Sequence, residues 1–142
     1  GGVGLASACD YTFGTVDASI KLSELAVGIG PFVVGPAVER KIGLSAAYEL
    51  AIDATGFRSA QWGQEKGLYA SVHPDIVSMD AAIFNLADTL AASSPAAMAE
   101  IKAAFWSGTE HWNELLLSRA AISGRLILTA EARVFLEGFK KK

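Results

Sequence analysis

The chain has 142 residues, of which 51% are hydrophobic and 19% are charged, and its formal net charge is −3. The length predicts one domain, the apolar content excludes a disordered chain, and the single Cys9 excludes a disulfide scaffold. The mild acidity argues against a nucleic-acid partner, and no apolar run approaches the roughly 20 residues that span a bilayer.

The first part of the chain predicts a short helix, two short strands and a break. Residues 5–9 are expected to form a helix after a glycine turn. Residues 11–15 and 19–23 are β-branched or aromatic and partly alternating, which is typical of short strands. Pro31 suits the start of a helix, because proline is favoured at the first helical position.

The rest of the chain predicts helices. Apolar residues at spacings of three and four predict a helix over 76–90. Gly67 is placed to end the helix before it, ahead of a short extended segment over 68–72. The other helices are expected to follow the N-cap residues Ser45, Ser59, Ser94, Thr109 and Thr129. The sequence therefore predicts an α/β chain with short strands followed by about six helices.

Most familiar catalytic motifs are missing from the sequence. His73 and His111 are far apart and have no second ligand at helical spacing, so no metal site is predicted. There is no G-x-S-x-G pattern for a serine nucleophile. The glycines of 28–35 fit neither of the nucleotide-binding spacings, and indicate a turn into a helix.

Glu24 is the first candidate for catalysis. It follows an extended run, and its neighbours Leu25, Ala26, Val27 and Ile29 are apolar. Desolvation in such surroundings disfavours the charged carboxylate, which suits a general acid or base. The alternative is a Glu that simply turns outward where the strand ends.

The glycine run at residues 1–4 is the second candidate, and the basic tail 140–142 is a weaker one. A glycine turn before a helix presents backbone N–H groups and the positive end of the helix dipole, as an oxyanion hole does. Any tight turn has the same features. The tail would be solvated, or would meet a phosphate-rich ligand.

Four ordered patterns resemble the crotonase superfamily, the enoyl-CoA hydratases and isomerases. The first is a glycine run with a small apolar helix that ends in Cys-Asp, and the second is a strand leading to Glu, Gly and Pro. The third is a Ser-Ala helix that ends in Gly-Leu, and the fourth is a closing Phe-x-Glu. They stand here at residues 1–10, 21–31, 59–68 and 135–137.

The resemblance implies an enzyme that acts on an acyl-CoA thioester. Gly1 would supply one of two backbone N–H groups that hold the thioester oxygen, and Glu24 would move a proton at the acyl chain. The first of the family's two hydratase carboxylates falls on Gly4, which has no side chain. Residues 23–28 and 38–43 look similar to the methylglutaconyl-CoA hydratase-like branch, so we expect a hydratase-type reaction. The alternatives are a double-bond isomerase that uses Glu24 alone, or a truncated, non-catalytic oligomerisation fragment.

The resemblance also implies further site residues and the domain organisation. Pro31, Phe32, Phe135 and Lys140 are expected to contact the substrate, with Lys140 in place of the family's lysine, which falls on Gly138. Residues 1–58 would end the core and residues 59–142 would form a helical trimerisation or lid region. The chain begins without Met, and we expect it to be the C-terminal half, or a little more, of a larger enzyme.

The expected partners follow from the same resemblance. The substrate is an acyl-CoA, so coenzyme A enters as part of the substrate and no separate cofactor is expected. A homotrimer or hexamer is expected, with no nucleic-acid or membrane partner, and the expected location is the cytoplasm.

Overall fold

The computed structural model describes residues 1–139, and in them the expected mixture of short strands and helices is confirmed. The elements, in chain order, are α1 (Gly2–Ala8), β1 (Phe13–Thr15), β2 (Ser19–Ile20), the 3₁₀ helix η1 (Leu25–Val27), α2 (Gly35–Ile52), β3 (Arg58–Ser59), α3 (Ala60–Glu65), β4 (Ser71–His73), α4 (Ile76–Ala91), α5 (Pro95–Phe105), α6 (Trp112–Leu126) and α7 (Ala130–Phe139).

The hydrophobic core lies between α2 and the short strands. One face of α2 buries four residues at helical spacing, and β2, the segment after it and the end of the α3 turn supply the others. Helix α1 packs against α2. Burial of this kind stabilises a fold by about 25 cal/mol for each Å² of apolar surface. The core residues are Ile20, Leu22, Val38, Ile42, Ala46, Leu50 and Leu68.

Two pairs of strands connect parts of the chain that are distant in sequence. β1 and β4 are parallel, with Gly14 opposite Val72, and β2 and β3 are antiparallel, with Ser19 opposite Ser59. Helix α3 lies so close to β2 that a Cβ atom on Gly63 would be 2.5 Å from Ile20 Cδ1. Only glycine allows this approach without a shift of the buried Ile20.

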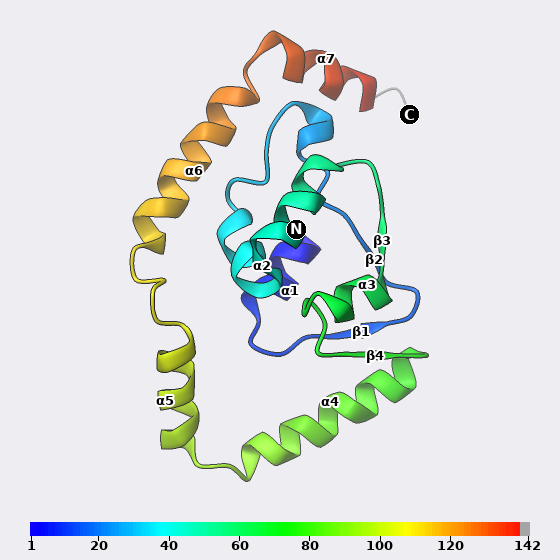
Figure 1. The fold of residues 1–142 in the computed structure, drawn as a ribbon, viewed down its shortest axis with the longest axis vertical. Helices are drawn as coiled ribbons and strands as arrows, with labels where there is room; N and C mark the ends of the chain where they lie inside the picture. The colour runs from blue at the N-terminus through cyan, green and yellow to red at the C-terminus, as the bar shows by residue number, and fades with distance from the viewer. Residues whose placement is uncertain (140–142) are drawn as a thin grey trace.

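Helices α4 to α7 form an open arc around the core (Figure 1). One end of the arc rests on the strands, where α4 contacts β1 and β4, and the other end rests on η1, which α7 contacts. Between these supports, α5 and α6 expose many large apolar side chains, among them Ile101, Phe105 and Leu117.

Three predicted N-caps are confirmed. The Ser59 hydroxyl accepts a hydrogen bond from Trp62 N (3.1 Å), that of Ser94 from Ala97 N (3.3 Å) and that of Thr129 from Ala132 N (3.3 Å). Gly67 has a φ of 82° and follows α3, as expected of a residue that ends a helix.

Other boundaries differ from the prediction. The helix expected at Pro31 begins at Gly35, because residues 32–34 form turns and the Pro31 carbonyl accepts from Gly35 N at 2.7 Å. The helix expected after Ser45 is the second half of α2, which is broken at Gly43 (φ 79°, ψ 158°). Thr109 does not cap α6: its hydroxyl donates to the Trp106 carbonyl, and His111 occupies the N-cap position.

The expected strands also end elsewhere. β2 stops at Ile20, so Glu24 does not follow a strand directly. The strand expected over 68–72 is β4 at 71–73, because Leu68 N and Tyr69 N both donate to the Gly63 carbonyl and close the α3 turn.

No single helix within residues 1–139 has the length and apolar composition needed to cross a membrane. Helices α4 and α5 reach that threshold only as a pair, and they are bent by 110°.

Candidate active site around Glu24

Glu24 is the N-terminal residue of a short 3₁₀ turn. Its carbonyl oxygen accepts hydrogen bonds from Val27 N and Ile29 N, both at 3.1 Å, and Gly28 ends the turn with a φ of 78°. A left-handed φ of this size favours glycine. These bonds hold the backbone of Glu24 in place next to the loop that leads to α2.

Glu24 is partly buried, and one oxygen of its carboxylate is shielded from bulk water. Its Oε2 atom is buried and has no hydrogen-bond partner among the described residues. A buried polar atom without a partner is costly, so its presence in a folded protein calls for an explanation. One explanation is that the partner is a substrate or a water molecule.

A small cavity of about 100 Å³ lies beside Glu24. Besides Glu24 and Ser123, the residues that line it are Ile29, Gly30, Pro31, Phe32, Val33 and Val34. The structure therefore brings together three of the predicted site residues, Glu24, Pro31 and Phe32. Pro31 and Phe32 also line a second cavity, of about 240 Å³, whose other walls include Leu22, Val38 and Tyr48.

The first turn of α1 reaches the same region through Gly4. A Cβ atom on Gly4 would lie 2.8 Å from Val34 Cγ1, and Val34 lines the Glu24 cavity. The Val34 side chain thus fills the space next to the position that carries a carboxylate in the two-Glu pattern.

Gly1 is exposed at the start of α1, and its carbonyl accepts from Leu5 N at 3.0 Å. The opposite end of the helix is fixed by two side chains. Thr12 Oγ1 donates to the Ala6 carbonyl (2.9 Å), and Lys41 Nζ donates to the carbonyls of Cys9 (2.9 Å) and Asp10 (3.2 Å). Burial lowers the pKa of Lys41. A cation at a helix C-terminus is favourable, so Lys41 helps to hold α1 in place.

The remaining predicted site residues lie on or after α7. Phe135 is half exposed and does not line the Glu24 cavity within the described part of the chain. Lys140 falls outside the described residues. Helix α7 nevertheless approaches the site, because Ala132 is fully buried and its Cα would lie 3.0 Å from a Cβ on Gly28.

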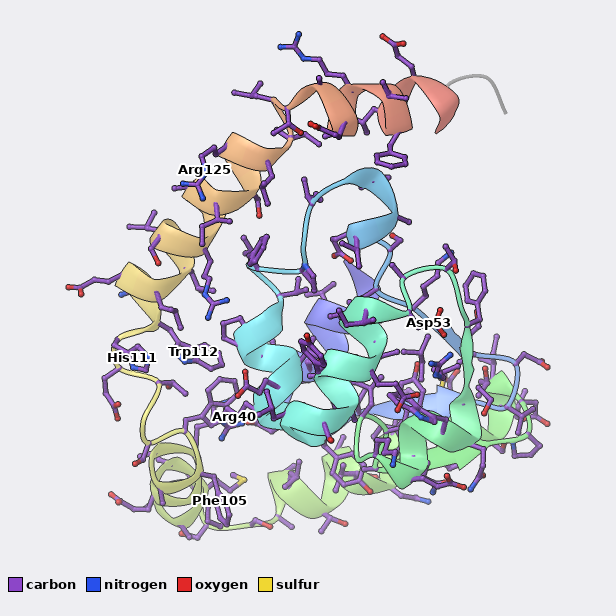
Figure 2. The ribbon with its side chains drawn as sticks, turned by 45° about the horizontal axis from the view of Figure 1, so that its top comes forward. Arg40, Asp53, Phe105, His111, Trp112 and Arg125 are labelled. Carbon is purple, nitrogen blue, oxygen red and sulfur yellow. The ribbon has the colours of Figure 1, made fainter. Side chains whose placement is uncertain are left out.

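A cluster of polar and aromatic side chains joins α5 to the end of α1, away from Glu24. Lys102 Nζ donates to Asp10 Oδ1 (2.7 Å) and Oδ2 (2.6 Å), and Trp106 Nε1 donates to Asp10 Oδ1 (2.6 Å). These bonds lower the pKa of Asp10. Arg40 lies over the Trp106 ring and donates to the Phe105 carbonyl; Figure 2 shows Arg40 and Phe105 facing each other.

Five residues that line the cavity were not predicted as site residues from the sequence: Ile29, Gly30, Val33, Val34 and Ser123. Val34 is one of several apolar residues in a glycine-rich loop, and no local pattern marks it. Ser123 lies on α6, about a hundred positions after Glu24, and only the tertiary fold brings it to the cavity. No group of three or more His, Cys, Asp or Glu side chains within residues 1–139 is arranged to hold a metal ion.

The chain was compared with protein families, with curated proteins and with solved structures. The family model described as enoyl-CoA hydratase/isomerase matches residues 1–136. No curated protein is similar enough in sequence to match the chain.

Solved structures with this fold include an enoyl-CoA hydratase from Mycobacterium avium, which is 27% identical, with a TM-score of 0.88 over 99% of this chain and 55% of that one. An enoyl-CoA hydratase/isomerase from Pseudoalteromonas atlantica T6c is 18% identical, with a TM-score of 0.87 over 99% and 56%. An enoyl-CoA hydratase from Bacillus halodurans is 18% identical, with a TM-score of 0.85 over 96% and 55%. The chain spans just over half the length of these structures.

Proposed function

Because the chain belongs to the enoyl-CoA hydratase/isomerase family, we propose that the protein it represents transforms an enoyl-CoA thioester, with Glu24 as the group that moves the proton. The observation that carries this proposal is the buried, unpaired Oε2 of Glu24 beside an otherwise mostly apolar cavity. A carboxylate within hydrogen-bond reach of a bound substrate can act as its general acid or base.

The proposed reaction is of the hydratase type. Glu24 takes a proton from water while the water oxygen bonds to the β-carbon of the enoyl group. The electrons of the double bond move to the thioester oxygen, where the backbone N–H of Gly1 helps to hold the negative charge. The enolate then takes the proton from Glu24 at the α-carbon, and the net result is the addition of one water.

Isomerisation is the second candidate, and the lining of the cavity favours it. Gly4 supplies no second carboxylate, and the wall next to it is the apolar side chain of Val34. In this reaction Glu24 removes a proton from the α-carbon of a 3-enoyl-CoA and returns it to the γ-carbon, so no water is needed. The two reactions are distinguished by mass, because only hydration adds a water to the product.

A variant of Glu24 tests the proposal. In the protein at its natural length, Glu24→Gln should lower kcat at least about 10²-fold for whichever enoyl-CoA is turned over, because general acid–base groups contribute about 10²- to 10⁴-fold. The amide is close in size, so the thermal unfolding temperature should stay nearly constant. The exposed Glu100→Gln on α5 is the control and should keep full activity.

Methylglutaconyl-like enoyl-CoAs are the first substrates to assay, because the sequence around Glu24 looks similar to that branch. Full turnover by Glu24→Gln would reject the proposed role of Glu24. A wild-type protein that binds copies of itself but turns over no enoyl-CoA would favour the non-catalytic alternative.

We also propose that the arc of helices joins copies of this chain into a homotrimer or hexamer. The supporting observation is the set of large apolar side chains that α4, α5 and α6 leave exposed, among them Phe84 (67% exposed) and Phe105 (74% exposed). Exposed apolar patches are typical of protein interfaces.

A further inference from the structure

Among residues 1–139, Ser123 is the one polar side chain that lines the Glu24 cavity besides Glu24 itself. It lies on α6, one of the helices of the arc, whereas the other lining residues all belong to the segment between Glu24 and Val34. The described residues therefore line the cavity from two sides, and the hydroxyl among them comes from α6.

The Ser123 hydroxyl is only weakly engaged within the protein. Its contact with the Arg119 carbonyl is 3.4 Å long, beyond the roughly 2.5–3.0 Å that is usual for a bond between a hydroxyl and an oxygen. For comparison, Ser118 on the same helix donates to the Leu115 carbonyl at 2.8 Å. The hydroxyl of Ser123 is thus free to accept or donate a second bond at little cost.

A water that reacts beside Glu24 needs more than one partner. Buried waters make about three hydrogen bonds on average, and Glu24 Oε2 offers one acceptor. On the side near Gly4, the described lining is the apolar Val34, which occupies the space in which a side chain at position 4 would lie. The cavity of about 100 Å³ is several times larger than the space that one water requires.

We propose that Ser123 is the positioning residue that holds the reacting water against Glu24. The Ser123 hydroxyl and Glu24 Oε2 would each form a hydrogen bond with the water. These two bonds would direct the water oxygen toward the β-carbon while a proton of the water passes to Glu24. Ser123 itself neither gains nor loses a proton over the whole reaction. This inference rests on the hydratase-type function proposed above.

The test separates water addition from proton transfer at carbon. In the protein at its natural length, Ser123→Ala should lower kcat for hydration of a 2-enoyl-CoA about tenfold or more, which corresponds to the loss of one hydrogen bond to the water. Exchange of the α-hydrogen of a saturated acyl-CoA with D₂O needs Glu24 but no reacting water, and should stay within about twofold. Ser123→Thr keeps a hydroxyl and should restore most of the hydration rate.

Ser118→Ala is the matched control, because it removes a hydroxyl from the same helix away from the cavity. Equal losses of hydration and exchange in Ser123→Ala, or no loss of hydration, would overturn the role of Ser123. Glu24→Gln should abolish both rates. If it abolished neither, the proposed function itself would fail, independently of Ser123.

Discussion

Gly4 has no room for a side chain, and one neighbour sets this limit. A Cβ atom there would lie 2.8 Å from Val34 Cγ1 and 3.3 Å from Val34 Cβ. Valine is stiff at χ1 because it branches at Cβ, so Val34 cannot easily turn aside. The same contact accounts for the missing second carboxylate, since a Glu at position 4 would need this space as well.

The contact predicts a coupled effect on stability. Gly4→Ala should lower the free energy of unfolding by up to about 2 kcal/mol, because overpacking costs about 1–3 kcal/mol and Ala gains only about 1 kcal/mol over Gly within a helix. Adding Val34→Ala should recover much of that loss, which urea denaturation of the two single variants and the double variant can measure. Strictly additive losses would show that the two residues do not collide.

Residues differ in how clearly the neighbouring sequence marks them as candidates for the site. The sequence indicates Glu24 as a candidate because a lone carboxylate stands among apolar residues and within a recognisable pattern, and its catalytic role stays a prediction. Its position on a 3₁₀ turn was not predictable, because the local pattern over residues 19–23 favours a strand, whereas β2 ends at Ile20. Ser123 carries no local signal, since its role depends on how α6 passes over a loop from the other end of the chain.

Helix α5 is joined to the end of α1 by the cluster of Asp10, Lys102 and Trp106. The partners of Asp10 lower its pKa below the usual 3.8. A carboxyl group whose pKa is lower in the folded state stabilises the protein above the unfolded-state value. That contribution is lost as the pH falls through the lower, folded-state pKa.

This linkage gives a prediction with a definite pH range. Asp10→Asn should cost less than about 1 kcal/mol near pH 7, because the carboxylate is largely exposed and its ion pair is screened. The stability difference from the wild type should shrink below pH 3.8. Chemical unfolding at a series of pH values measures it.

Lys102→Met provides the matched background for that experiment. Met retains the apolar stem but removes the ammonium group that donates to Asp10. In this background, the pH-dependent part of the Asp10→Asn effect should become smaller. A difference that persists unchanged would show that Lys102 does not stabilise the Asp10 carboxylate.

At the scale of elements, three of the five predicted N-caps were confirmed, whereas Ser45 lies inside α2 and Thr109 does not cap α6. Ser59, Ser94 and Thr129 each bond a backbone N–H of the first helical turn, an interaction encoded within four residues. The start of α2 was placed at Pro31 and lies at Gly35, since the turns after Pro31 form part of the Glu24 cavity. Tertiary packing around the Glu24 cavity therefore places the start of α2 later in the chain than the sequence predicts.

The whole molecule divides into a packed core and an arc of helices that is supported at its two ends (Figure 1). The types of element that form the core could be predicted, because the apolar spacing of α2 and the strand patterns are visible within short stretches of sequence. The curvature of the arc was not, since α5 and α6 have few apolar contacts with the core and their direction depends on the loops between helices.

The exposed apolar side chains of the arc predict self-association of the protein at its natural length. Sedimentation should give a trimer or hexamer at micromolar concentration. Phe84→Glu should raise the apparent dissociation constant at least about tenfold, because it places a charge in an apolar interface. Asn85→Glu, the neighbouring exposed position, is the control. A wild-type monomer would contradict the proposed assembly.

The contact between Ala132 and Gly28 has a genetic consequence. The codons for α7 come after all those for the hydrophobic core, yet this helix rests on the turn that begins with Glu24. A premature stop codon soon after residue 129 would therefore leave the core sequence intact and uncover the turn beside the carboxylate. The amount of such a truncated protein in a cell would therefore not indicate its enzymatic activity.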